Sequence, residues 1–382
     1  MVTRSLPATF MRGGTSNGLM IHRSDLPQDE RRWQPILASA MGSPDPYGRQ
    51  LDGMGSGVSS TSKICVVSRS ERDDADVEFT FVQVGIKDGV LDLAGNCGNM
   101  SSAVGPFALD EGLVPHVKPT EDDGEASVRI FNTNTSKVIH SRFKTARGRY
   151  DPSGDYSIDG VPGGQSCITL SFLDPAGAKT GKALPTGNPV DSLYLPDGST
   201  VNASLIDIAN PGVFVLAADL GVPGDVAPEV LGAELALMTR LESIRQAGAS
   251  KMGLDPATQT VPKIVLIAGP DSSAGDVHIR CRALSMQQAH KAVPLTLALN
   301  LGAACNLEGT LPYLTAVGAA GKPSVIIEHA SGKLEVGSVV DKEGRIESAL
   351  LRRTARFLMK GEVFYSVPEL RRMGSMINIA TI

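Results

Sequence analysis

Residues 94–106 of the chain read Ala-Gly-Asn-Cys-Gly-Asn-Met-Ser-Ser-Ala-Val-Gly-Pro and mark the passage from an expected strand into an expected helix. We predict the strand over residues 89–93 and the helix over residues 100–109. Small residues around Cys97 leave the first backbone N–H groups of that helix uncovered, so the helix start can bind an anion. The helix dipole also lowers the pKa of a thiol placed there. The stretch therefore predicts a carboxylate site beside a group that can carry a proton.

A second segment, residues 289–304, resembles the helix at residues 100–109 in being almost fully apolar. Neither segment has a polar stripe wide enough for a surface helix, so each is expected to be buried on most sides. Each follows a predicted strand, at residues 89–93 and 277–282. The chain is therefore interpreted as an internal structural duplication, in which the starts of two buried helices face each other across a cleft suited to a di- or tricarboxylate.

The remaining elements are mostly short strands, because glycine and proline recur between short apolar runs. Two further helices are expected at residues 33–40 and 228–247. Strands are expected at residues 8–11, 18–22, 63–68, 77–84, 128–132, 138–145, 165–172, 205–208, 212–217, 263–268, 323–328, 333–340 and 346–355. Residues 174–195, rich in Gly, Pro and Thr, are predicted to link the halves.

The composition excludes several classes of function. The chain has 382 residues, a formal net charge of −5 and no long run of Lys or Arg, which argues against a nucleic-acid partner. It has no signal-peptide core and no run of about 18 apolar residues, so we expect a cytoplasmic protein that does not bind membranes. The five cysteines form no Cys-x-x-Cys pair, so neither a disulfide framework nor a zinc site is indicated.

Two residues are candidates for proton transfer. Lys63 precedes an apolar run, residues 64–67, and an amine at the mouth of a buried strand can lose its proton and act as a general base. The simpler interpretation is a surface lysine at a strand end. For Cys97 the simpler interpretation is a small buried apolar residue, but its neighbours are Gly and Asn rather than Leu and Val.

Two further positions are candidates for carboxylate binding. In the turn at residues 10–18, Gly13 and Gly14 allow close backbone approach, and Arg12 can bind a carboxylate through two hydrogen bonds. The alternative is a plain turn between two strands. His290 is placed at the start of the second buried helix, where a capping or packing histidine is the alternative.

With these residues the chain resembles the PrpF family of 2-methylaconitate cis–trans isomerases, which includes methylitaconate delta-isomerases and 4-oxalomesaconate tautomerases. The matching stretches are residues 11–18, 56–63, 95–106, 172–191, 210–212 and 284–296. The resemblance implies a diaminopimelate epimerase-like α+β fold of two similar domains, each a mixed and mostly antiparallel sheet around a central helix. We place the first domain at residues 1–190, joined by the C-terminal segment 368–382, and the second at residues 191–367, with the active site between them.

The resemblance also implies which residues form the site. Lys63 and Cys97 are the implied proton-transfer pair. Substrate contacts are implied for Arg12, Gly13, Gly14, Thr15, Ser16, Asn17, Ser62, Asn96, Gly98, Asn99, Met100, Asn210, Ser285 and His290. Asn17 stands where the family usually has lysine, which leaves the exact substrate open. Epimerases of this fold begin the second central helix with a cysteine, and that position falls at or near His290 here, which argues against a two-cysteine racemase.

We therefore predict an isomerase that moves an allylic proton in an unsaturated di- or tricarboxylate. Lys63 takes the proton, and backbone N–H groups around residues 97–99 together with Arg12 stabilise the enolate. No metal or organic cofactor is expected, and a homodimer is compatible with this interpretation. Keto–enol tautomerisation of 4-oxalomesaconate is the alternative reaction. A non-catalytic partner of an iron–sulfur dehydratase is the alternative from another class.

Overall fold

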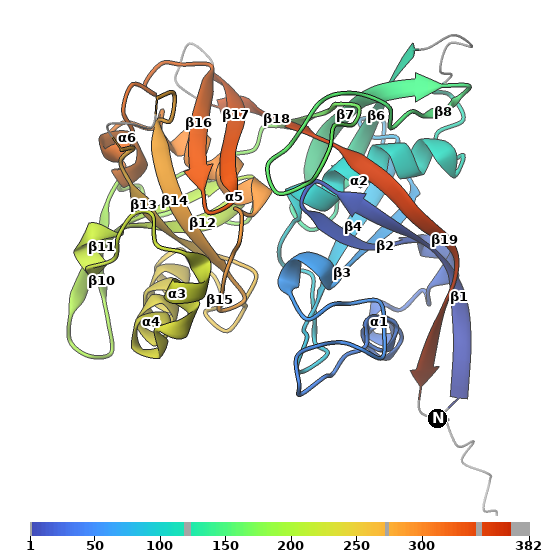
Figure 1. The fold of residues 1–382 in the computed structure, drawn as a ribbon, viewed down its shortest axis with the longest axis horizontal. Coiled ribbons are helices and arrows are strands. Elements are labelled where there is room, and N and C mark those ends of the chain that lie inside the picture. Colours follow the sequence, from blue (N-terminus) through green and yellow to red (C-terminus); the bar gives the residue numbers. More distant parts are fainter. Residues whose placement is uncertain (1, 118–123, 272–274, 341–345, 368–382) are drawn as a thin grey trace, which may run out of the picture.

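The chain folds into two α+β halves that lie side by side (Figure 1). The computed structural model describes residues 2–117, 124–271, 275–340 and 346–367. The first half contains β1 (Val2–Gly13), β2 (Ser16–His22), α1 (Gln34–Met41), β3 (Lys63–Arg69), β4 (Val77–Val84), β5 (Leu91–Asp92), α2 (Gly98–Asp110), β6 (Gly124–Asn132), β7 (Lys137–Ala146), β8 (Arg149–Tyr150) and β9 (Ile168–Leu173).

The second half contains β10 (Asp191–Tyr194), β11 (Thr200–Ile208), β12 (Asn210–Leu216), α3 (Pro228–Ala233), α4 (Leu235–Lys251), β13 (Lys263–Ala268), β14 (Ile279–Ser285), β15 (Gln288–Ala289), α5 (Leu295–Ala304), α6 (Leu311–Thr315), β16 (Ser324–His329), β17 (Gly332–Val340) and β18 (Ile346–Arg353). A last strand, β19 (Ala355–Val367), returns to the first half. This architecture confirms the α+β class predicted from the sequence.

The two halves repeat the same strand pairings. In the first half β2–β3 is parallel, β3–β4 antiparallel, β4–β6 parallel and β6–β7 antiparallel. The second half repeats this series as β12–β13, β13–β14, β14–β16 and β16–β17. Parallel neighbours need a crossover connection, which contains α1 between β2 and β3 and contains α3 and α4 between β12 and β13. The expected internal duplication is therefore present in the topology.

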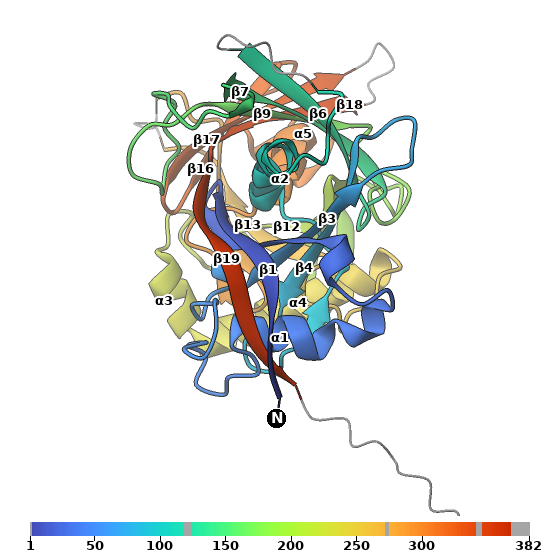
Figure 2. The ribbon, with the colours of Figure 1, turned by 90° about the vertical axis from the view of Figure 1, so that its right-hand side faces the viewer.

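α2 and α5 are the central helices of the two halves (Figure 2). Every residue of α2 from Gly98 to Leu109 is buried, and so is every residue of α5. The two helix starts meet, because a Cβ atom added to Gly98 would lie 3.1 Å from Cβ of Leu295 and 3.2 Å from Cγ2 of Thr296. The prediction that two buried helices face each other with their N-termini is confirmed.

The second central helix begins later than predicted. α5 starts at Leu295, and residues 288–289 form β15, which pairs with the end of β14. The apolar run at 289–304 thus contains a turn before the helix. Pro294 stands at the N-cap, where its missing N–H group costs no helical hydrogen bond. His290 therefore precedes the helix instead of opening it, and its predicted position as the helix start is wrong.

The outer helices α1 and α4 cover the sheets on the sides away from α2 and α5. α1 packs in a core that includes Trp33 and Leu37, and α4 packs in another that includes Leu241 and Ile244. The single helix expected at 228–247 is divided into α3 and α4 at Glu234, whose φ of −83° and ψ of 81° are not helical.

β19 completes the first half with residues from the far end of the described chain (Figures 1 and 2). It pairs antiparallel with β1 along the whole length of that strand, from Val2 opposite Val367 to Gly13 opposite Ala355. The sequence-based division assigns residues 355–367 to the second domain, and the structure differs there. β19 is mostly exposed, and buried and exposed residues do not alternate along it. The sequence therefore lacks the alternation of apolar and polar residues that indicates a strand with one buried face. Residues 368–382, expected to join the first domain, lie outside the described residues.

Candidate active site between the central helices

A cavity lies where the starts of α2 and α5 meet, with walls from both halves. It is lined by Ser16, Ser59, Lys63, Phe81, Gln83, Gly95, Asn96, Cys97, Asn99, Thr260, Lys263, Ser285, His290, Pro294, Leu295 and Thr296. Of the residues predicted for the site, the structure brings together here Ser16, Lys63, Asn96, Cys97, Asn99, Ser285 and His290. These lining residues include two lysines and no carboxylate. The cavity is therefore suited to a negatively charged ligand.

Lys63 is the first residue of β3, and its side chain is held in the cavity wall. It is 8% exposed. Its Nζ donates to Oε1 of Gln83 at 2.7 Å and lies 5.0 Å from the centre of the Phe81 ring. Gln83 is fixed in turn, because its Nε2 donates to the backbone oxygens of Ser59 and Ser62 at 3.2 and 2.8 Å. The interpretation as a surface lysine is wrong, because β3 pairs with β2 and β4 and the side chain of Lys63 is buried among their residues and the cavity wall.

Cys97 is the N-cap residue of α2 and is partly buried. Its side chain makes no capping hydrogen bond, and the first turn of α2 contains no acidic residue. α5 begins in the same way, with Pro294 at the N-cap, no side-chain cap and no acidic residue in its first turn. Helix starts without caps keep free N–H groups and the positive end of the dipole. Two such ends converge on the thiol and on the cavity.

Asn99 links the cavity to the turn between β1 and β2. The backbone N–H of Thr15 donates to Oδ1 of Asn99 at 3.3 Å, and Nδ2 of Asn99 donates to Oγ1 of Thr15 at 3.1 Å. Nε of Arg353 donates to the same Oδ1 at 3.3 Å. Burial lowers the pKa of Arg353 to about 10. Arg353 ends β18 and reaches the first half because β18 pairs with β9 and the chain then continues into β19, which pairs with β1. No local sequence signal therefore indicates it.

His290 contributes a neutral imidazole to the cavity. Burial, assisted by the positive charge of Lys63, lowers the pKa of His290 to about 4. The backbone N–H of Ala292 donates to Nδ1 at 3.0 Å. In a neutral imidazole whose Nδ1 accepts, the ring proton is on Nε2. His290 therefore offers a hydrogen-bond donor without a full charge.

Lys263 is the lining residue of greatest chemical interest that sequence reasoning missed. It is the first residue of β13 and is 7% exposed. Its Nζ donates to the backbone oxygen of Thr260 at 2.6 Å. Burial, and then the charge of Lys63, lower the pKa of Lys263 to about 8. The internal duplication could have indicated Lys263. In each half a lysine begins the strand that pairs in parallel with the strand before the crossover, Lys63 in β3 and Lys263 in β13.

Arg12 does not line the cavity. Its Nη1 donates to the backbone oxygens of Gly14 and Thr354 at 2.7 and 3.2 Å. Its Nη2 donates to Oγ1 of Thr354 at 3.0 Å and to Oε1 of Gln165. The guanidinium group therefore connects the end of β1 to the segment between β18 and β19, instead of facing a ligand as predicted.

The glycine-rich turn approaches the start of α2. A Cβ atom added to Gly13 would lie 2.5 Å from the backbone oxygen of Asn99, and Gly14 has a φ of +53° that other residues rarely adopt. Close backbone approach was predicted at both glycines. In the structure this close approach lets the end of β1 pack directly against the start of α2, and the packing holds Asn99 in place.

The other predicted residues are not among those that line the cavity. Gly98 lies against α5, and Met100 is fully buried in the common core. Ser62 is buried and donates to a backbone oxygen of β4. Asn210 is fully buried, and neither atom of its side-chain amide has a hydrogen-bond partner among the described residues. The same holds for Oδ1 of Asn17.

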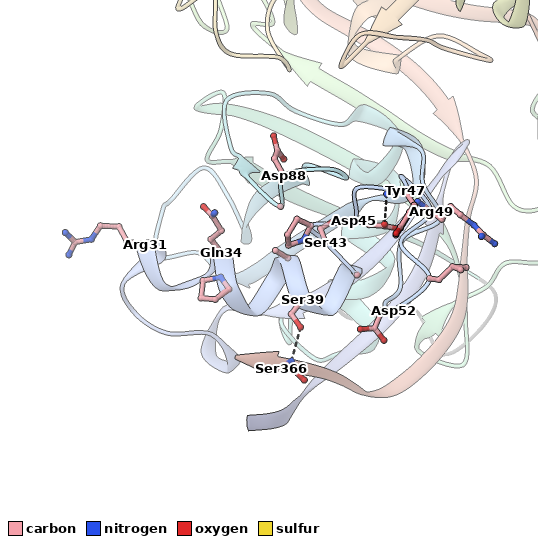
Figure 3. Close-up of a pocket in the computed structure, with 16 residues that line it drawn as sticks. Arg31, Gln34, Ser39, Ser43, Asp45, Tyr47, Arg49, Asp52, Asp88 and Ser366 are labelled. Atoms are coloured by element: carbon pink, nitrogen blue, oxygen red, sulfur yellow. Dashed lines mark hydrogen bonds between the residues drawn. The ribbon is translucent and has the colours of Figure 1, made fainter. Parts of the chain in front are cut away.

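A larger concavity, of about 780 Å³, lies on the outer surface of the first half, beside α1 (Figure 3). It contains none of the predicted site residues. The carboxylate of Asp45 accepts the backbone N–H groups of Tyr47 and Arg49, and Oγ of Ser39 accepts that of Ser366. These two polar groups hold the surrounding loops and β19 in place.

No metal site and no membrane span are found in the part of the chain that the structure describes. There, no three His, Cys, Asp or Glu side chains lie close enough together to hold a metal ion. Every helix in the same ranges is too short or too polar to span a lipid bilayer.

Comparisons with known proteins show the family to which the chain belongs. The model of the family described as PrpF protein matches residues 3–366. The chain belongs to this family. It is 37% identical to the 3-methylitaconate isomerase of Eubacterium barkeri, over 96% of this chain and 98% of the relative. It is 38% identical to the 2-methyl-aconitate isomerase of Cupriavidus necator (94% and 96% covered) and 37% identical to the 4-oxalomesaconate tautomerase of Pseudomonas putida (94% and 95% covered).

Solved structures support the same assignment. The crystal structure of methylitaconate-delta-isomerase is similar to this PrpF-family chain with a TM-score of 0.76 and 35% identity, over 98% of this chain and 100% of that one. A hydroxyproline epimerase from Agrobacterium vitis shares the fold, with a TM-score of 0.57 and 12% identity over 96% and 94% of the two chains. The predicted family and epimerase-like fold are confirmed, and membership of this family makes the chain an isomerase.

Proposed function

We propose that this PrpF-family protein moves an allylic proton within an unsaturated di- or tricarboxylate by general acid–base catalysis. One observation carries the proposal. The buried amine of Lys63 and the thiol of Cys97 share a cavity that is walled by two uncapped helix starts and lined by no carboxylate. Helix starts of this kind bind carboxylates, and the amine of Lys63, held in the cavity wall by Gln83 at 2.7 Å, is placed to remove a proton from an acid bound there.

The reaction begins with Lys63 as the base. The amine takes a proton from the allylic carbon, and the electron pair of that C–H bond enters the conjugated system to form an extended enolate. Backbone N–H groups in the first turn of α2 and Nε2–H of His290 are the donors available to its oxygens. Each well-placed donor stabilises such a transition state by roughly 3–4 kcal/mol.

The second step returns a proton to a different carbon. Either the ammonium of Lys63 supplies it, or the thiol of Cys97 supplies it and the thiolate then takes the proton held by Lys63. In both cases the double bond moves or re-forms and the enzyme returns to its starting state. The bond that was double has single-bond character in the enolate, so rotation about it accounts for a cis–trans outcome. The substrate and the product have the same atoms and the same charge, so the residues of this cavity suffice for the chemistry.

The names of the relatives direct the choice of substrate. They name methylitaconate, 2-methyl-aconitate and 4-oxalomesaconate. We propose an aconitate-type acid as the first candidate for this chain and tautomerisation of 4-oxalomesaconate as the second, because the full-length match to all three relatives supports both. Asn17 departs from the family pattern, and its Oδ1 is buried with no hydrogen-bond partner among the described residues, so we propose this position as one that affects which acid is accepted.

The proposal is tested by following proton exchange. The protein is incubated in D₂O with separate samples of trans-aconitate, 2-methylaconitate, itaconates and 4-oxalomesaconate, and NMR records deuterium incorporation and isomer formation. We expect turnover of at least one acid. Lys63→Met is expected to lower the exchange rate by about 10²–10⁴-fold, which is the usual contribution of a general base.

Two further variants complete the test. Cys97→Ser separates the roles of base and acid, because it is expected to slow isomer formation more than initial proton removal. Lys87→Met removes an exposed lysine and is expected to leave the rate unchanged. Exchange by Lys63→Met at the parental rate would overturn the proposed role of Lys63.

A further inference from the structure

Lys263 is a buried cation for which the proton-transfer scheme above has no role. It lines the cavity together with Lys63. Its Nζ has one hydrogen bond, to the backbone oxygen of Thr260, and forms no ion pair with any residue in the described ranges. Because an ammonium group has three N–H donors, two remain for a ligand. None of the residues that line this cavity is a carboxylate. On its other side Lys263 faces a second pocket with Glu242, whose carboxylate is paired with Arg245 at 2.7 Å.

Lys263 occupies the same position in the second half as Lys63 occupies in the first half. In the second half, β12 and β13 pair in parallel with Gly212 opposite Lys263. In the first half, Gly18 lies beside Lys63, one position before the first registered pair of β2 and β3. In both halves the next strand is antiparallel and leads through a short strand to the central helix. The duplication therefore directs one amine from each half into a single cavity.

We propose that Lys263 is a second catalytic residue, which binds one substrate carboxylate and the developing enolate charge as an ammonium. The inference rests on the proposed function for the identity of the anion, an unsaturated polycarboxylate. The helix starts supply only partial charges, whereas Lys263 supplies a full positive charge from the second half. Lys63 and Lys263 thus have complementary roles, one as the base and one as the cation.

The surroundings of Lys263 are compatible with an ammonium that has an anion beside it. With a pKa of about 8, roughly 90% of the side chain is protonated at pH 7 in the free protein. A bound carboxylate opposes the effects of burial and of the neighbouring amine, so it raises this fraction. The ionisable groups that act on Lys263 are Lys63, Asp92, Cys97 and Arg245, and Lys263 in turn acts on His290.

The role of Lys263 requires no additional reactant. When Lys63 takes the allylic proton, the negative charge of the new enolate rests largely on carboxylate oxygens. Lys263 donates hydrogen bonds to these oxygens and keeps its proton. When a proton is returned to the other carbon, the charge on the oxygens falls and the product is an isomer of the substrate.

The experiment compares Lys263→Met and Lys263→Gln with Lys63→Met and the exposed-lysine control Lys87→Met. Calorimetry measures the dissociation constant of trans-aconitate, and steady-state assays measure kcat and KM. Loss of a charge-assisted hydrogen bond is expected to weaken binding by Lys263→Met about 10- to 100-fold. Lys63→Met is expected to bind within a few-fold of the parent and to lose exchange. Lys263→Gln retains a donor for the Thr260 oxygen, so this variant separates the loss of charge from a local structural defect.

The outcomes distinguish this inference from the proposed function. Weak binding by both Lys263 variants, with parental circular dichroism, supports the inference. Parental binding and parental kcat/KM in either variant overturn it, even when the wild-type enzyme is active. If the wild-type protein binds trans-aconitate but exchanges no proton of any acid tested, the proposed function fails, while the binding comparison still decides whether Lys263 holds the anion.

Discussion

The burial of Lys263 predicts an unusual dependence of stability on pH. The pKa of this amine is about 8 in the folded protein and 10.5 ordinarily, so between these values the unfolded chain binds more protons than the folded one. The free energy of unfolding therefore rises with pH in that range. Below about pH 8 the folded protein carries the full penalty of a buried ammonium, and above about pH 10.5 the penalty is gone. Lys263→Met has no such titration.

The magnitude follows from the size of the shift. A fall from 10.5 to about 8, at about 1.36 kcal/mol per pH unit, corresponds to a penalty of about 3 kcal/mol at pH 7. At pH 9.5 about 1.4 kcal/mol of it remains by the same linkage relation. Relative to Lys263→Met, the wild-type protein is therefore expected to gain about 2 kcal/mol between pH 7 and 9.5. The hydrogen bond lost from Thr260 shifts the variant by a similar amount at both pH values and cancels.

Urea unfolding at pH 7 and at pH 9.5 measures this difference. Far-UV circular dichroism reports on both halves, and the fluorescence of Trp33, the single tryptophan, reports on the first half. Coincident transitions justify a two-state free energy. Lys87→Met replaces an exposed lysine and is expected to show no comparable change. A difference between wild type and Lys263→Met that is constant with pH, or that changes in the opposite direction, refutes the reasoning.

Three more results are expected. Gln83→Leu removes the acceptor that holds Nζ of Lys63 at 2.7 Å, so kcat should fall about tenfold while KM changes little, and steady-state kinetics that show only a higher KM contradict this. Because the pKa of His290 is about 4, its NMR ring signals should not titrate between about pH 5 and 8, and a midpoint near the ordinary value of about 6.5 contradicts the neutral assignment. Gly13→Ala places a Cβ atom 2.5 Å from the backbone of α2, so urea unfolding should show a loss of about 1–3 kcal/mol. Gly232→Ala, with nothing within 4 Å of its Cβ, should be neutral or stabilising, and an equal loss in both variants contradicts a local clash.

Local patterns in the sequence were sufficient for most elements and for part of the site. The strands predicted at 77–84 and 263–268 have the same bounds as β4 and β13. Apolar and polar residues alternate along most of the first, and the second is an apolar run after its initial lysine. Cys97 was identifiable because small polar residues precede an apolar helical segment, and that arrangement is a property of adjacent residues. The burial of α2 followed from its lack of a polar face.

Local patterns failed where distant segments decide the environment. β19 has no alternating pattern, because its position depends on hydrogen bonding to β1 rather than on a buried face. Arg12 has the chemistry of a carboxylate ligand, but its donors are taken by residues after β18 and before β9. Pro294 delays the start of α5, which moves His290 out of the helix and into the cavity wall.

The sequence by itself determined the many short strands, the two buried helices and a thiol at the start of one of them, since these depend on periodicity and on the preferences of neighbouring residues. The α+β class followed from the resemblance to the PrpF family. Only the tertiary structure decided that the amines of Lys63 and Lys263 are enclosed in one cavity between those helices. A lysine has the same side chain whether it is exposed or buried. Its protonation and its use depend on desolvation and on nearby charges, and in this protein both come from segments that are far apart in the chain.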